Sequence, residues 1–146
     1  YNRVGFAVFA DQHLKSAGRE NRSFFVFFAV LDGLTGIVER FGKPEGDQAL
    51  TTTAIILRES FRTSDVIARM GPDVFAIIAP DNKDYSPKVV TSRLKKSQTY
   101  HSAQYNRYRL SLSVSATRFI PRDVTSADLI AKADQMFADY KKSPFP

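Results

Sequence analysis

The chain has 146 residues, a size typical of one domain, and its hydrophobic fraction of 43% with 12 Phe suffices for one buried core. It has no Cys, which excludes disulfide bonds, thiolate metal sites and a cysteine nucleophile. No run approaches the roughly 18 to 20 apolar residues of a membrane helix, and the net charge of +6 predicts a surface that attracts nucleotides, nucleic acid or anionic lipid.

A helix followed by a strand is predicted at the start of the chain. Apolar residues recur at helical spacing over residues 2–17, and Gly18 offers a stop signal. Residues 24–31 form a continuous run of Phe, Val, Ala and Leu, which favours a strand covered on both faces in the middle of a sheet. We expect its Phe side chains to be core and not a platform for stacking bases.

Two helical stretches come next. An Asp-Gly pair at 32–33 ends the strand, and a broken helical stretch follows to residue 41. The glycines and the proline of segment 42–46 mark a turn. A second helix, with apolar residues placed to pack on the sheet, is predicted over residues 47–61.

A short hairpin follows this helix. Residues 66–69 and 74–79 are predicted as two strands, separated by a loop at 70–73 that contains Gly and Pro. We expect a functional site, if the chain has one, at the tip of this hairpin.

The last part of the chain predicts helix, strand and helix. Ser86 as N-cap and Pro87 in the first turn open a helix to about residue 97. We expect a polar surface loop over 98–106, a strand with one buried face over 107–117, and a final helix over 125–142.

Strands interleaved with helices predict an α/β or α+β sandwich, with helices packed against one sheet. Residues 1–146 are expected to form one domain. The chain opens at Tyr1 with no Met and no basic-then-apolar leader, so we expect this domain to be cut from a longer protein.

Four segments, in family order and at family spacing, resemble signatures of the GGDEF family, the diguanylate cyclases that join two GTP molecules into cyclic di-GMP. The segments are Asn2-Arg3, residues 41–47 (FGKPEGD), residues 64–75 (SDVIARMGPDVF), and Ala133-Asp134 with Lys141. The resemblance covers essentially the whole chain. It implies a mostly antiparallel sheet flanked by helices, with the signature motif on the hairpin, in a domain of bacterial signalling.

The hairpin departs from the family pattern. The signature G-G-D/E-E-F stands here as Gly71, Pro72, Asp73, Val74 and Phe75. Val74 cannot replace an acid, because an isopropyl group neither accepts a proton nor meets a cation. The central-strand Asp that holds magnesium in the family falls on Val30, and only the second acid of that motif remains, as Asp32.

Further departures concern the substrate pocket of the family. The lysine near the phosphates falls on Thr35 and the asparagine that reads guanine falls on Val38, whereas the guanine-contacting acid is kept as Asp47. Pro72 removes a backbone N–H at the tip. Phosphoryl transfer depends on positioning and metal charge, so we expect no catalytic residues, no cyclase activity, no cofactor and no tightly bound Mg²⁺.

A second family site is kept. Arg62 and Asp65 match the R-x-x-D motif at which bound product inhibits many family members, and the further arginine of that site falls on Arg93. Guanidinium groups can grip a guanine edge or a phosphate bidentately, and a carboxylate can accept from guanine N–H groups. The resemblance therefore implies a site for cyclic di-GMP.

Simpler roles stay open for these residues. Asp65 could cap or orient the start of the strand, and Arg93 could be an ordinary exposed helix residue. Turn formation would explain Asp32 and Asp73, and an N-cap role would explain Asp47.

Other polar residues give weaker signals. His13 and His101 lack the spacing of metal ligands, so no metal site is expected. Aromatic and basic residues interleave at Tyr100, Tyr105, Arg107, Tyr108 and Arg109. This pattern is typical of partner or nucleic-acid binding, but a polar loop and a strand edge explain it more simply.

The sequence thus predicts a cytoplasmic, catalytically inactive GGDEF domain that acts as a cyclic di-GMP receptor. The alternatives are a module that docks a protein partner or a neighbouring sensor or effector domain, and a weak residual cyclase or GTP site. No nucleic-acid partner and no membrane span are expected, and a homodimer is left open.

Overall fold

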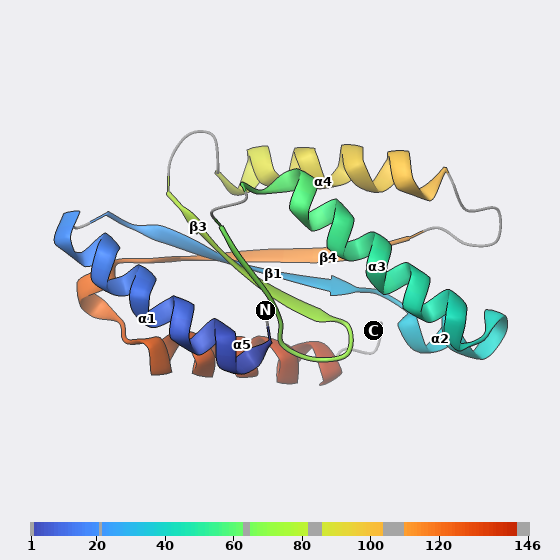
Figure 1. Cartoon of the computed structure of the whole chain (residues 1–146), viewed down its shortest axis with the longest axis horizontal. Coiled ribbons are helices and arrows are strands. Elements are labelled where there is room, and N and C mark those ends of the chain that lie inside the picture. The colour runs from blue at the N-terminus through green and yellow to red at the C-terminus, as the bar shows by residue number, and fades with distance from the viewer. Residues whose placement is uncertain (1, 21, 63–64, 82–85, 104–109, 143–146) are drawn as a thin grey trace.

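The computed structural model describes residues 2–20, 22–62, 65–81, 86–103 and 110–142 (Figure 1). One sheet lies between two layers of helices. In chain order the elements are α1 (Arg3–Glu20), β1 (Phe24–Leu31), α2 (Leu34–Phe41), α3 (Lys43–Ser60), β2 (Val66–Arg69), β3 (Val74–Pro80), α4 (Pro87–Ser102), β4 (Leu112–Phe119), the short 3-10 helix η2 (Pro121–Asp123) and α5 (Ser126–Lys142).

The sheet is antiparallel, with strand order β2-β3-β1-β4. β1 pairs along its length with β3 on one side and β4 on the other, as its uninterrupted apolar sequence predicts. The predicted fold class, an antiparallel sheet flanked by helices, is confirmed.

Alternate residues of β1 feed two cores. Phe24, Val26 and Phe28 pack with α1 and α5, whereas Phe27 and Leu31 pack with α2, α3 and α4. Figure 1 shows α3 and α4 on one side of the sheet and α1 and α5 on the other. The expectation that the Phe-rich strand is core is therefore confirmed.

Three helices have boundaries that differ clearly from the prediction. α1 continues past Gly18, since a glycine inside a helix costs only about 1 kcal/mol. α3 begins at Lys43, because Pro44 is tolerated in a first helical turn. α4 continues to Ser102, so residues 98–102 of the segment predicted as a surface loop are helical.

The predicted cap of α4 is present, and α5 also begins with a cap. The Oγ of Ser86 accepts from the backbone N–H of Val89 at 3.3 Å at the start of α4. At the start of α5, Thr125 and Asp128 exchange hydrogen bonds between side chain and backbone, as a capping box does. β4 begins at Leu112, five residues later than predicted, and residues 104–109 lie outside the described part.

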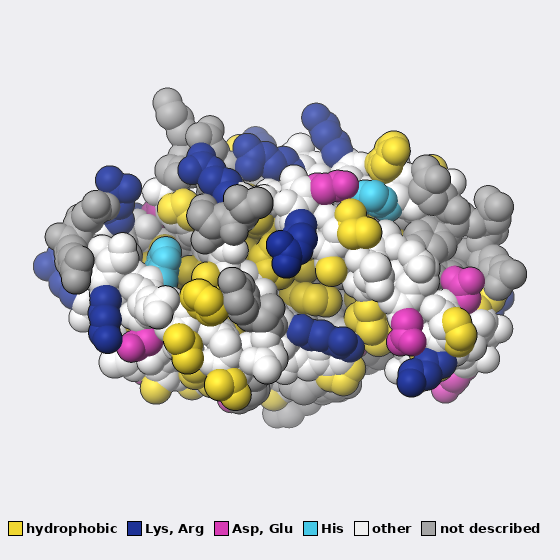
Figure 2. Space-filling view, in the orientation of Figure 1, with side chains coloured by type: hydrophobic (Ala, Val, Ile, Leu, Met, Phe, Trp, Pro, Cys, Tyr) yellow, Lys and Arg dark blue, Asp and Glu magenta, His cyan; other side chains and the backbone are white. Residues whose placement is uncertain are grey.

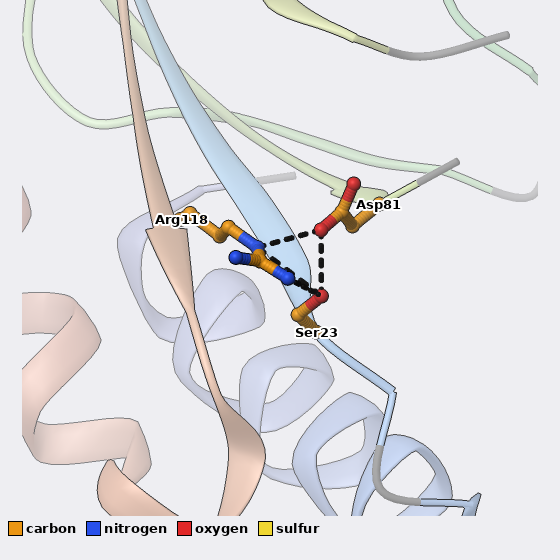
Figure 3. Close-up of polar contacts among 3 residues, drawn as sticks. All are labelled: Ser23, Asp81 and Arg118. Atoms are coloured by element: carbon orange, nitrogen blue, oxygen red, sulfur yellow. Dashed lines mark hydrogen bonds and ion pairs between the residues drawn. The ribbon is translucent and has the colours of Figure 1, made fainter. Parts of the chain in front are cut away.

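A polar network closes the end of the sheet opposite the hairpin (Figure 3). The hydroxyl of Ser23, just before β1, donates to Oδ2 of Asp81 at 2.6 Å, and Nε of Arg118 on β4 donates to the same oxygen at 2.7 Å. The Ser23 hydrogen bond, opposed by burial and helped by Arg118, lowers the pKa of Asp81. This network joins the ends of three strands. The predicted site positions lie away from it, at the other end of β1 and on the layer of α3 and α4.

Candidate functional site

The hairpin between β2 and β3 is closed by its own groups. The carbonyl of Val74 accepts from the N–H groups of Met70 and Gly71, and the carbonyl of Asp73 accepts from the N–H of Leu31 at 2.9 Å. The Arg69 guanidinium donates to the carbonyls of Gly71 at 3.2 Å and Pro72 at 2.7 Å. Sequence reasoning gave Arg69 no role, since this contact depends on the folded turn.

The two lost carboxylate positions face each other across the sheet. Val30 on β1 pairs directly with Val74 on β3, and the two residues are 7% and 1% exposed. A pocket of about 350 Å³ lies over them. Its other lining residues are Phe28, Ser113, Val114, Ser115, Met136 and Asp139.

The paired valines supply no ligand for magnesium at these two positions. Mg²⁺ prefers hard oxygen ligands in octahedral array, and isopropyl groups supply none. Asp139 is the one carboxylate among the described lining residues of this pocket, and Oδ1 of Asp73 is buried with no hydrogen-bond partner. Among the described residues, no cluster of three or more His, Asp or Glu residues could hold a metal ion.

Asp32 is occupied by the neighbouring strand segment. Its carboxylate accepts from the hydroxyls of Ser111 at 3.0 Å and Ser113 at 2.9 Å, and its N–H donates to the Ser111 carbonyl. It therefore fastens the end of β1 to the start of β4. A turn-stabilising role fits this arrangement, and the serine partners could not be read from the sequence.

At the position where the family has the asparagine that reads guanine, Val38 packs against α3. Thr35 and Val38 are exposed on α2, and Asp47 is exposed within α3. A Cβ placed on the buried Gly46 would lie 2.5 Å from Cγ2 of Val38. The N-cap interpretation of Asp47 was wrong, because α3 begins four residues earlier and Gly42 takes the cap position.

A second pocket adjoins Asp47. It has a volume of about 310 Å³ and is lined by Asp47, Leu50, Thr51, Ala54, Arg69 and Phe75. Phe75 itself is 6% exposed and belongs to the core on the α3 and α4 side. The pocket thus has apolar walls between one carboxylate and the guanidinium that holds the hairpin tip.

Arg62 and Asp65 lie together in the turn between α3 and β2. Oδ2 of Asp65 accepts from the backbone N–H of Arg62 at 2.9 Å, and the N–H of Asp65 donates to the Arg62 carbonyl at 3.0 Å. The Arg62 side chain is exposed and that of Asp65 is half-buried. The turn-forming role left open for Asp65 is present, and it fixes where the Arg62 side chain starts.

Arg93 is exposed on α4, the helix that packs beside α3. Glu59, three residues before Arg62 and near the end of α3, accepts at Oε2 from the hydroxyl of Ser97 at 2.6 Å, and Ser97 lies one turn after Arg93 on α4. Nε2 of His101 is 3.1 Å from the same oxygen. The Ser97 hydrogen bond, followed by that of His101, lowers the pKa of Glu59.

The α3 and α4 layer is also rich in positive charge. Figure 2 shows Lys and Arg side chains gathered along the upper rim of the molecule, over α4. The exposed basic residues of α4 are Lys88, Arg93, Lys95 and Lys96. This surface is suited to a polyanionic ligand.

Comparison with known proteins decides the family. Residues 1–145 match the family model described as the GGDEF domain of diguanylate cyclases. The chain belongs to the GGDEF family. Within the described parts of this GGDEF domain, none of the helices combines the length and the apolar character that crossing a membrane requires.

Relatives at the sequence level are much longer proteins. The bifunctional diguanylate cyclase and cyclic di-GMP phosphodiesterase MucR of Pseudomonas aeruginosa is 29% identical over 126 residues, which are 85% of this chain and 18% of MucR. The probable diguanylate cyclase DgcE of Escherichia coli is 25% identical over 135 residues, covering 91% of this chain and 12% of DgcE. The chain therefore spans less than a fifth of these relatives.

Solved structures share the fold of this GGDEF domain. The GGDEF domain of TpbB (YfiN) from Pseudomonas aeruginosa superposes with a TM-score of 0.80 at 23% identity, covering 99% of this chain and 86% of that chain. The GGDEF domain of DgcB from Caulobacter crescentus, solved in complex with c-di-GMP, gives a TM-score of 0.76 at 19% identity, covering 99% of this chain and 87% of that chain.

Proposed function

We propose that this GGDEF domain is a cytoplasmic receptor for cyclic di-GMP and does not synthesise it. The observation that carries the proposal is the direct pairing of Val30 with Val74 in an apolar pocket, set against the exposed arginines of the α3 and α4 side. At these two positions the chain supplies no oxygen ligand for the divalent cation that phosphoryl transfer requires.

Ligand binding is proposed at Arg62, Asp65 and Arg93. Arg62 starts from a turn that the Asp65 carboxylate holds, and Arg93 extends from the neighbouring helix. Two guanidinium groups and one carboxylate match the phosphates and guanine edges of a cyclic dinucleotide. The absence of Cys from the chain suits the reducing compartment in which we place the domain.

Titration calorimetry with cyclic di-GMP tests the site. Arg62→Ala should weaken binding by about 1.5–3 kcal/mol, because it removes hydrogen bonds to a charged ligand. Arg58→Ala is the matched control, since Arg58 is also exposed and lies on α3 one turn earlier. Its affinity should stay near that of the wild type.

Two results would contradict the receptor proposal. One is no heat from the wild type at tens of micromolar ligand, and the other is equal affinity of Arg62→Ala and Arg58→Ala. The inactive-enzyme part is tested separately by incubation with GTP and Mg²⁺ followed by chromatography. A cyclic product from the wild-type domain would show that Val30 and Val74 do not prevent catalysis.

A docking module is the second candidate. Val4 and Val8 lie one turn apart on α1 and are 73% and 51% exposed, and the relatives of this chain carry long additional sequence. A partner or neighbouring domain captured equally by the wild type and Arg62→Ala, but lost in a Val4→Ser and Val8→Ser double variant, would favour it.

A further inference from the structure

One polar cluster joins α3 to α4 beside the proposed ligand site. It consists of Glu59 on α3 with Ser97 and His101 on α4, and is called the α3–α4 latch below. Both contacts end on Oε2 of Glu59, at 2.6 Å from the Ser97 hydroxyl and 3.1 Å from Nε2 of His101. The Ser97 distance is typical of a hydroxyl that donates to an ionised carboxylate.

The chain directions place this latch next to the arginines. Figure 1 shows α3 and α4 running in opposite senses, and the two helices are in contact. The hydrogen bonds of the latch place Glu59, near the end of α3, beside Ser97 and His101 in the second half of α4. Arg62 follows Glu59 by three residues, and Arg93 precedes Ser97 by four. Going forward from Glu59 past the end of α3 at Ser60, and going back one turn along α4 from Ser97, leads the same way.

The rest of α4 is held independently of the latch. Val90 and Leu94 are buried in the core, and Nε2 of Gln98 donates to the Leu110 carbonyl at 2.9 Å. The Glu59 side chain, by contrast, is 51% exposed. Loss of the latch should therefore shift the face of α4 that carries Arg93 without unfolding the helix.

We propose that Glu59, Ser97 and His101 are positioning residues that set the spacing between Arg62 and Arg93, and so tune the affinity for a cyclic dinucleotide. This inference rests on the proposed function. The latch touches no ligand atom; it acts by preorganising two guanidinium groups that come from different elements. By linkage, a bound ligand should in turn protect the latch from opening.

Calorimetry on latch variants provides the first test. Glu59→Ala and Ser97→Ala should each weaken cyclic di-GMP binding by about three- to ten-fold, the size expected for an exposed polar contact that acts on a site indirectly. Ser97→Thr keeps a hydroxyl and should restore affinity to within about two-fold. Glu39→Ala, at an exposed acid on α2, is the control and should not change the affinity.

A double-variant cycle separates positioning from a general loss of stability. Arg93→Ala should cost less affinity in the Glu59→Ala background than in the wild type, because the arginine is already misplaced there. Additive effects, or unchanged affinity in a folded Glu59→Ala domain, would overturn the inference.

Hydrogen exchange tests the latch without ligand. In the wild type, the backbone amides of residues 97–102 should exchange more slowly than in Glu59→Ala, and Glu39→Ala should match the wild type. Equal exchange in all three overturns the latch. If exchange differs but no variant and no wild type binds cyclic di-GMP, the latch stands as a structural contact, the proposed function fails, and the affinity role fails with it.

Discussion

The hairpin end of the sheet and the α3–α4 face differ in how much charge they place at the surface. At the hairpin end, Arg69 donates to backbone carbonyls, Asp32 accepts from two serines, and Val30 meets Val74 in a mostly apolar pocket. The α3–α4 face also has internal hydrogen bonds, at Glu59, but its Arg62 and Arg93 side chains are exposed. The first region is organised mainly around the protein's own stability, whereas the second adds two guanidinium groups at the surface.

The largest expected effect comes from returning one acid to the hairpin end. Val30→Asp places a carboxylate at a 7% exposed position opposite Val74, where its partner on β4, Ser113, already donates its hydroxyl to Asp32. We expect a loss of about 3–5 kcal/mol in the free energy of unfolding, the usual cost of an unpaired buried charge. Urea denaturation at pH 7 measures it.

Val30→Thr is the control for this substitution, because it changes the shape little and adds no charge. The loss in Val30→Asp should also shrink near pH 5, where a buried carboxyl is more readily protonated. If Val30→Asp unfolds at nearly the urea concentration of the wild type, the pocket is wetter than its lining residues indicate, and the contrast between the regions weakens.

A middle-sized effect is expected at Gly46. Gly46→Ala brings a Cβ within 2.5 Å of Val38 Cγ2, and a β-branched side chain on a helix has little rotamer freedom to move away. We expect a loss of about 1–3 kcal/mol in the free energy of unfolding, as in overpacked cores. Thermal or urea unfolding gives the value.

Two variants check the cause of the Gly46 effect. Val38→Ala combined with Gly46→Ala should recover most of the loss, because the clashing methyl group is gone. Gly36→Ala, where a Cβ would meet no atom within 4 Å, should stabilise α2 by about 0.5–1 kcal/mol. Equal effects at both glycines would show that Val38 has not been absorbed into helix packing.

The smallest expected effect uses His13, which belongs to neither region. Burial lowers the pKa of His13 below its ordinary value of 6.5, so the unfolded chain binds more protons than the folded domain as the pH falls below about 6.5. Stability is therefore highest above that pH and declines below it.

His13→Leu should flatten this decline, and it removes a buried Nε2 that has no hydrogen-bond partner. Unfolding curves of the wild type and His13→Leu, measured between pH 7.5 and 5, give the change in the free energy of unfolding with pH. The linkage relation predicts that this change differs between the two proteins by less than about 1 kcal/mol. Cyclic di-GMP affinity at pH 7 should be the same in both proteins. A changed affinity would mean that the α1 side of the sheet communicates with the α3–α4 face.

The sequence predicted the fold well where the local signal and the tertiary structure agree. The Phe-rich run gave β1 with its bounds, and Ser86 gave the start of α4. The prediction was wrong where tertiary contacts overrode the local pattern. α3 begins at Lys43 because Pro44 fits its first turn, and α4 runs on past residue 97 with Gln98 bonded to the Leu110 carbonyl.

For the candidate site, too, the sequence predicted some features and not others. Motif spacing alone identified the positions of Val30 and Val74 and the turn of Arg62 and Asp65. It could not predict that Asp32 would bind Ser113, 81 residues away in the chain, or that Arg69 would hold the hairpin tip. These contacts depend on which strand segments and turns meet after folding.

The direct pairing of Val30 with Val74 also limits how such a domain could evolve. An acid introduced at either position alone would be a buried carboxylate facing a valine, and so a destabilising mutation. Selection would act against that intermediate before a second change arose. Under the proposed function, a return to catalysis would therefore have to pass through a less stable protein, while substitutions on the exposed α3–α4 face stay open to gradual change.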